Sequence, residues 1–386
     1  MNRSALPLVA LALAGSASGV RAQSSVTLYG LLDTSVMYVT KADASGGNLV
    51  SAGSGNLLGN RWGLKGSEDL GGGLKAIVQI EGGFNPNTGR LGQGGRLFGR
   101  QSFVGLSSPR FGTLTLGRQY DVLTDATWSI GGVGYFGNAF STPGDVDNYN
   151  ATSRTDKTVK YVSPSFNGLT LSGMYALGGV AGSTGSGQTW GAAAAYKNGG
   201  LSVGGGYLFM TNTNPAATLR TGWSGTSDGT FGGSAINGGY ASAKSISIAR
   251  ATVNYDAGAM IYGAYYSNAR YTPDAYSAFR STQRYDTGGA LLGYRPSPVV
   301  LLGLSYAYTK ASGDTSASYH QVALGSDYFL SKRTDLYLVG AWQRANGTQR
   351  TANGGLQAAR ASIGSFGFAG GGTNQLLVSA GMRHRF

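Results

Sequence analysis

The sequence contains no cysteine, only two histidines and nine prolines among 386 residues. The absence of cysteine excludes a disulfide scaffold and any thiolate metal site. After the N-terminal segment, no stretch of 18 or more consecutive apolar residues occurs, which excludes an ordinary transmembrane helix. A chain of this kind is either soluble or a β-barrel, because in lipid only helices and closed barrels satisfy every backbone polar group.

The first 22 residues have the three parts of a signal peptide. Arg3 is followed by an apolar stretch from Leu6 to Ala17, and Val20-Arg21-Ala22 has the small-x-small spacing of a cleavage site. The alternative is an ordinary buried helix, but charged start, apolar middle and cleavage site occur in the right order. The sequence therefore predicts export, with a signal peptide at 1–22 and a mature barrel chain at 23–386.

The chain combines 66 glycines with 23 tyrosines. Glycine at this level would suggest disorder, but an aromatic content of 11% argues against it. Short strands with aromatic girdles use both residue types. Loss of the signal peptide removes two arginines and lowers the net charge from +13 to +11. Because the basic residues are scattered singly and no recognition motif accompanies them, nucleic acid is not expected as a partner.

Apolar and polar residues alternate with a period of two in many segments, as in strands with one apolar face. The clearest examples are 26–38, 74–81 and 300–309, and helical spacing is poor throughout. Short turns rich in Gly, Pro, Asn and Asp alternate with long polar connections. Seven predicted hairpins lie near residues 60–84, 98–119, 158–177, 188–210, 246–268, 282–310 and 318–344.

With a first and a last strand, these hairpins predict an all-β fold, a sixteen-stranded antiparallel transmembrane β-barrel. The last strand, Asn374 to Phe386, places Met382 and His384 on one side and Arg383 and Arg385 on the other. The arginines are expected to face the lumen. The last strand must pair with the first, because lipid cannot satisfy an open edge.

Several motifs resemble a known family. They are Ser25-Val26-Thr27-Leu28-Tyr29-Gly30, the segment Gly63 to Gly71, the segment Gly99 to Leu106, the segment Tyr328 to Thr334, and the terminal Phe386. Together they resemble the general trimeric outer-membrane porins of β-proteobacteria, over essentially the whole mature chain. The segment 63–71 is the most specific part.

The resemblance implies a homotrimer in the Gram-negative outer membrane, in contact with lipid and lipopolysaccharide, through which ions and small hydrophilic solutes diffuse passively without a cofactor. It also implies a third external loop that folds inward and narrows each pore. Phe386 resembles the signal recognised by the barrel-assembly machinery, and the alternative is a plain girdle aromatic.

Residues 120–156 form the longest stretch without strand alternation in the first half, and we expect this stretch to be the constriction loop. Its local net charge is −4, since five aspartates face a single arginine, Arg154. The alternative is a solvated acidic surface loop. The aspartates are Asp121, Asp125, Asp145, Asp147 and Asp156.

Basic residues in the neighbouring strands are expected to line the opposite wall. They are Arg61, Lys65, Lys75, Arg100, Arg118 and Lys160. Strand parity turns Arg61 and Lys65 to the water side, but it groups Arg100 and Arg118 with leucine and valine residues. Their inward aim therefore requires a bulge or the family resemblance. That resemblance maps the basic cluster of the pore wall onto Arg61, Arg100 and Lys160.

Opposed positive wall residues and negative loop residues would create a transverse field that orients polar solutes and slows apolar ones. Because bases exceed acids in the mature chain, we expect a weak preference for anions.

Two other classes of function are open to a β-barrel. An outer-membrane hydrolase would need a nucleophile with a positioned base, but only His320 and His384 are available, and neither pairs with a second histidine for metal binding. An adhesive barrel could use Ser/Gly/Thr-rich loops such as Thr211 to Lys244, which we interpret as flexible surface segments.

Overall fold

The computed structural model describes residues 24–213, 219–229 and 231–386. The predicted signal peptide at 1–22 lies outside these residues. Among the described residues, no helix is long and apolar enough to cross a membrane.

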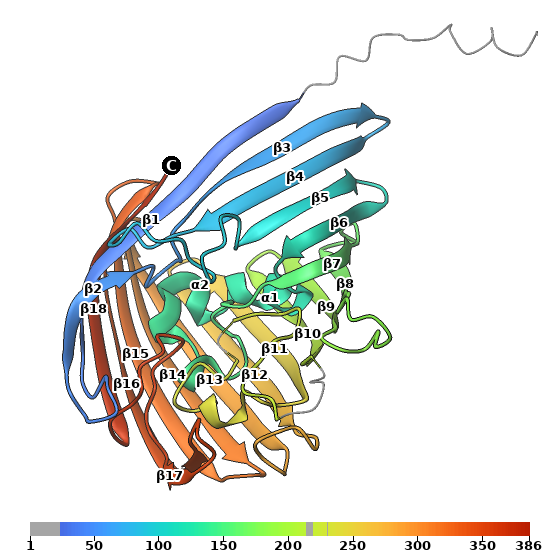
Figure 1. The fold of residues 1–386 in the computed structure, drawn as a ribbon. Coiled ribbons are helices and arrows are strands. Elements are labelled where there is room, and N and C mark those ends of the chain that lie inside the picture. Colours follow the sequence, from blue (N-terminus) through green and yellow to red (C-terminus); the bar gives the residue numbers. More distant parts are fainter. Residues whose placement is uncertain (1–23, 214–218, 230) are drawn as a thin grey trace, which may run out of the picture.

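Sixteen long antiparallel strands form a ring (Figure 1). The first eight are β1 (Ser25–Val39), β3 (Arg61–Gly71), β4 (Leu74–Gly83), β5 (Gln101–Ser108), β6 (Gly112–Gln119), β7 (Thr155–Val162), β8 (Leu169–Ala176) and β9 (Thr189–Asn198). The other eight are β10 (Leu201–Thr211), β11 (Ser245–Ala257), β12 (Met260–Thr272), β13 (Gln283–Ser297), β14 (Val300–Ser312), β15 (Ala317–Phe329), β16 (Thr334–Arg350) and β18 (Asn374–Arg385). The seven predicted hairpins are confirmed.

The ring closes where β18 pairs with β1, from Leu31 opposite Arg385 to Val39 opposite Leu377. Two shorter strands do not add to the ring. The strand β2 (Leu49–Ser54) pairs with one half of β1 while β3 pairs with the other half, and β17 (Leu356–Ala358) extends the end of β16. The predicted pairing of last strand with first is confirmed, so the barrel has no free edge.

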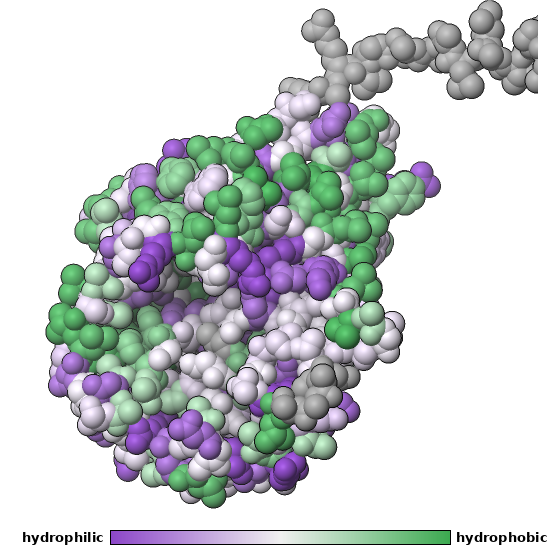
Figure 2. Space-filling model, in the orientation of Figure 1, coloured by the Kyte–Doolittle hydropathy of each residue, from purple (hydrophilic) through white to green (hydrophobic). Residues whose placement is uncertain are grey.

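The alternation in sequence separates an apolar outside from a mixed inside. In β18, Val378 and Met382 are exposed on the outer face, whereas Ser379 and Arg383 are buried inside. Figure 2 shows hydrophobic residues over the outer surface of β3–β6 and hydrophilic residues along the rim of a hollow. An apolar belt of this kind is stable against lipid and would be unfavourable in water.

The segment between β6 and β7 folds into the barrel, as expected, and contains short helices (Figure 1). These are α1 (Val122–Thr127), η1 (Trp128–Ile130), α2 (Gly132–Phe136), η2 (Gly137–Phe140) and η3 (Pro143–Asp145). We call residues 120–154 the constriction loop. Strand β7 begins at Thr155, so Asp156 lies in a strand and not in the loop, which corrects the predicted boundary.

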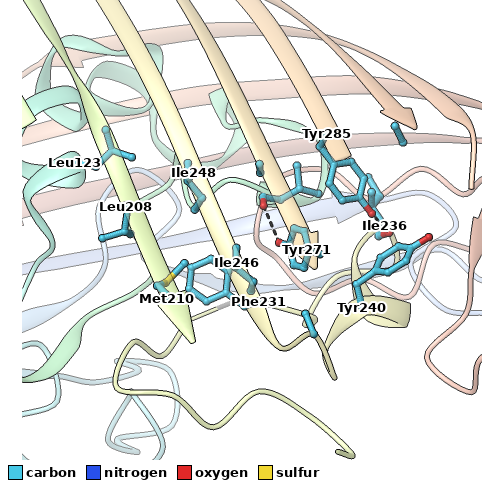
Figure 3. Close-up of a cluster of buried hydrophobic side chains, with 14 of the residues drawn as sticks. Leu123, Leu208, Met210, Phe231, Ile236, Tyr240, Ile246, Ile248, Tyr271 and Tyr285 are labelled. Carbon is cyan, nitrogen blue, oxygen red and sulfur yellow. Dashed lines mark hydrogen bonds between the residues drawn. The ribbon is translucent and has the colours of Figure 1, made fainter. Parts of the chain in front are cut away.

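The connection between β10 and β11 also folds inward, contrary to the interpretation of Thr211 to Lys244 as a flexible surface segment. Its described residues include η4 (Gly238–Tyr240), and its Phe231, Ile236 and Tyr240 are buried against the inner faces of β11–β13 (Figure 3). Tyr271 of β12 meanwhile donates a hydrogen bond to the carbonyl of Val146 in the constriction loop, 2.7 Å away. Sequence analysis missed this packing because serine and glycine around the three apolar residues dominate the composition.

Glutamines on the inner wall hold irregular loop backbone that would otherwise lack partners. Gln321 donates to the carbonyls of Ala139 and Ser141 in the constriction loop, over 3.1 and 2.7 Å. Gln343 donates to the carbonyl of Ser362, in the connection between β16 and β18, and accepts that residue's N–H. Uncharged amide side chains thus satisfy buried backbone groups without introducing charge. The helices of the constriction loop contact the walls formed by β8–β11 and by β14–β16.

Candidate functional site

A cavity of about 190 Å³ lies between the constriction loop and the wall of the first strands. Three guanidinium groups line it: Arg61 from β3, Arg100 from just before β5, and Arg154 from the end of the loop. Tyr120 and Trp128 are the aromatic members of the lining. No carboxylate is among the described residues that line this cavity.

Arg100 is held rigidly at the cavity wall. Its Nε donates to Glu81 of β4 over 2.6 Å, and its Nη2 donates to the hydroxyl of Tyr120 over 2.8 Å. Arg100 and Glu81 are both almost completely buried, so the pair is charge-assisted and screened little by salt. Glu81 also accepts from Tyr29 over 2.9 Å. The pairing fixes where the remaining donors of Arg100 point.

Arg154 is placed by the loop itself. Its Nη1 donates to the carbonyls of Ala151 and Thr152, over 3.0 and 2.8 Å, and its guanidinium lies 4.1 Å from the centre of the Tyr120 ring. Its Nη2 also donates to the Tyr120 hydroxyl. The Nε of Arg154 is buried without a hydrogen-bond partner among the described residues. A buried donor of this kind is unfavourable unless water or a solute meets it.

Tyr120 lies between two guanidinium groups, and its hydroxyl accepts hydrogen bonds from both Arg100 and Arg154. Burial by itself would raise the pKa of its hydroxyl, but the guanidinium groups of Arg100 and Arg154 outweigh burial and lower that pKa below its usual value. Tyr120 stands directly after β6, so the wall and the loop meet at this residue.

Arg100 and Arg118 point inward in spite of strand parity, for identifiable reasons. Val104 and Leu116, which share their parity, are exposed on the outer face. Arg100 precedes the first residue of β5 and is free of its alternation. At Arg118, Gly117 has a φ of 134° and the β6–β7 register shifts between Gly117 and Gln119. This is the bulge that the sequence argument required.

Of the six predicted wall bases, only Arg61 and Arg100 line the cavity. Lys160 pairs with Asp125 over 2.7 Å, and Arg118 pairs with Asp156 over 2.6 Å. The other two lie elsewhere on the wall. Lys65 rests 4.6 Å from the centre of the Tyr29 ring, and Lys75 lies near the β3–β4 turn, opposite Asp69 and Ser107.

Asp121, Asp145 and Asp147 have partners that fasten the loop, whereas Asp125 meets Lys160 of the wall. Asp121 caps α1 by accepting the N–H of Thr124 over 2.8 Å. Asp147 is buried and accepts from Thr142 over 2.6 Å, with Arg250 of β11 3.6 Å away. Asp145 is also buried, and burial raises the pKa of its carboxyl to about 7, with Asp147 adding to the shift. These carboxylates have partners inside the protein, and the opposition of two charged rows across the passage stays a prediction.

Sequence analysis missed four residues of this region: Glu81, Tyr120, Arg154 as a lining base, and Asp228. Glu81 shares the inward parity of its strand, which was a usable signal. Asp228 gave none, because it comes from the β10–β11 connection, 110 residues after Arg118.

Neither histidine belongs to this site. His320 contacts the hydroxyl of Tyr306, and His384 contacts that of Thr334. Among the described residues, no group of three or more histidines or carboxylates could hold a metal ion.

Comparison with known proteins gives a consistent result. A family model described as "Gram-negative porin" matches residues 8–348. The chain is 32% identical to outer membrane porin protein 32 of Delftia acidovorans, over 98% of this chain and 99% of that protein. It is 40% identical to an outer membrane porin protein of Bordetella pertussis, over 42% of this chain and 45% of that protein. Among solved structures, the anion-selective porin from Comamonas acidovorans matches with a TM-score of 0.71 and 26% identity, covering 94% of this chain and 100% of that chain.

Proposed function

Because this chain belongs to the Gram-negative porin family, outer-membrane channels rather than enzymes, we propose that its constriction passes small hydrophilic solutes with a preference for anions. The observation that carries the proposal is the charge of the cavity. Three arginines line it, and among the described residues Glu81 is the only carboxylate bonded to any of them. The group has a net charge of +2 by this count.

Positive charge in a narrow passage with low-dielectric walls raises the local concentration of anions. The guanidinium donors offer hydrogen bonds that partly replace the hydration shell of a carboxylate or phosphate. An apolar solute forms no hydrogen bonds with these donors and still has to displace water from the passage. The Comamonas relative is named as anion-selective, which agrees with this preference.

The same proposal includes the expectations about how the protein is exported and assembled. They are the homotrimer, contact with lipopolysaccharide, recognition of Phe386 by the barrel-assembly machinery, and cleavage of the signal peptide at 1–22. In support, Phe386 is anchored by hydrogen bonds in both directions with Gly30, of 2.9 and 3.1 Å, and its side chain stays exposed on the outer surface. Single-channel recordings with conductance steps in threes would test the trimer.

Reversal potentials in a KCl gradient across a planar bilayer test the selectivity. The wild-type reversal potential should lie toward the chloride equilibrium potential. The double variant Arg61→Glu with Arg100→Glu should move it toward the potassium potential, because two lining charges change sign. Lys75→Glu is the matched control, since Lys75 lies outside the cavity lining, and should have a much smaller effect. A cation-selective wild type would refute the proposal, and an unchanged double variant would remove these arginines from the constriction.

A further inference from the structure

We propose that Asp228, carried by the inward-folded β10–β11 connection, is a specificity-determining residue that neutralises Arg118 and so limits the positive charge of the constriction. This inference rests on the proposed function in one respect: both concern the passage beside the constriction loop.

The contacts of Asp228 join three separate parts of the chain. Its Oδ2 accepts from Nη2 of Arg118 on the barrel wall, and from Nη1 of Arg96 in the β4–β5 connection over 3.0 Å. Its Oδ1 accepts the backbone N–H of Arg154 over 2.9 Å, and its own N–H donates to the carbonyl of Arg154 over 3.0 Å. Asp228 therefore touches the last residue of the constriction loop and the neighbouring wall at once.

All three guanidinium nitrogens of Arg118 donate to acceptors within the protein. Its Nε donates to the carbonyl of Gly99 over 2.7 Å, Nη1 to Asp156, and Nη2 to Asp228. Its side chain is 8% exposed, whereas that of Asp228 is 30% exposed. Arg118 and Arg96 balance Asp156 and Asp228, so this cluster is neutral and the net charge of the passage comes from the adjacent cavity.

Removing the charge of Asp228 leaves one uncompensated positive charge next to the constriction. Asp228→Asn keeps an Oδ1 that can accept the Arg154 N–H, so it changes the charge and preserves the backbone contact. Asp228→Ala removes both the charge and the Oδ1 acceptor for the Arg154 N–H. A change in selectivity that appears already in Asp228→Asn comes from the charge. A change that appears only in Asp228→Ala comes from disorder of the loop.

We expect Asp228→Asn to raise the chloride-to-potassium permeability ratio roughly twofold at low salt, as one unit charge within a Debye length would. Adding Arg118→Gln to Asp228→Asn should return the ratio to the wild-type value. The control Asp274→Asn removes an equal charge from the Asp274–Arg220 pair, which joins the β10–β11 and β12–β13 connections. Among the described residues this pair contacts neither Arg118 nor Arg154, so the ratio should stay unchanged.

The measurement is the reversal potential relative to wild type, in a KCl gradient at low and high salt. The wild-type value decides the proposed anion preference, whereas the difference between variant and wild type decides this inference, whatever sign the wild type has. An Asp228→Asn channel with wild-type selectivity would overturn the inference. A gain that persists after Arg118→Gln is added would do the same, because the freed charge would then not belong to Arg118.

Discussion

The ring of Phe136, in helix α2 of the constriction loop, occupies the space over Gly303 in the barrel wall, where any side chain would overlap it. Gly325, paired directly with Gly303 across β14 and β15, is covered by the same ring. Phe140 stacks on Phe136 with ring centres 4.6 Å apart. Two facing glycines thus form a seat that fixes the middle of the loop on the wall formed by β14 and β15.

We predict that Gly303→Val displaces Phe136 and pushes the loop toward the arginine cavity, which lowers single-channel conductance. Overpacking a buried site should also cost about 1–3 kcal/mol of stability. Gly288→Val is the control, because a side chain at Gly288, on neighbouring β13, would meet open space. Equal conductance in the two variants would show that the seat does not position the loop.

The second prediction concerns alkaline pH. While its hydroxyl is protonated, Tyr120 is neutral and leaves the arginine charges intact. As pH rises toward its lowered pKa, the hydroxyl loses its proton and adds a negative charge between Arg100 and Arg154. Anion preference should therefore decline with rising pH, by roughly twofold for a single charge.

Tyr120→Phe should flatten this decline while keeping the ring over which Arg154 lies. Reversal potentials between neutral and alkaline pH measure it, with Tyr161→Phe on the outer face of β7 as control. A decline of the same size in Tyr120→Phe would assign the effect to other groups.

The third prediction concerns a buried charge cluster at the last strand of the barrel. Arg383 of β18 contacts Asp327 of β15 and Asp335 of β16, each at 3.0 Å, and all three side chains are almost fully buried. Removing the arginine leaves two buried carboxylates without their main partner. Arg383→Met should therefore lower the free energy of unfolding by about 3–5 kcal/mol.

Arg385, two residues along the same strand, is the matched control. It contacts Asp335 at 3.3 Å but is 39% exposed, so Arg385→Met should cost less than about 1 kcal/mol. Urea unfolding in detergent micelles gives both values. Similar costs for the two variants would mean that the buried cluster contributes no more to stability than the exposed contact does.

The strands and their closure were predictable because the physical constraint acts locally. Each residue of a spanning strand faces either lipid or the interior, so a period of two is written into short segments such as β14 and β18. Glycine-containing turns add a second local signal: Gly71, Gly72 and Gly73 all have positive φ between β3 and β4. The hairpins and the pairing of first with last strand follow from such signals.

Contacts inside the barrel were not predictable in the same way. Arg118 and Asp228 meet across 110 residues, and the burial of Tyr240 in a serine- and glycine-rich segment leaves no periodic trace. Sequence charge counting placed Arg154 among the acids of the loop, whereas the structure turns it into the cavity beside Arg61 and Arg100. It also left open whether each aspartate faces solvent or a partner.

The sequence by itself therefore determined an exported antiparallel barrel with one long loop lacking strand alternation and an excess of basic residues, because alternation, turns and composition are properties of neighbouring residues. Only the tertiary structure decided which of those bases remain available to a solute. That outcome depends on hydrogen-bond partners that inward-folded connections and wall strands bring close together in space from distant positions in the sequence.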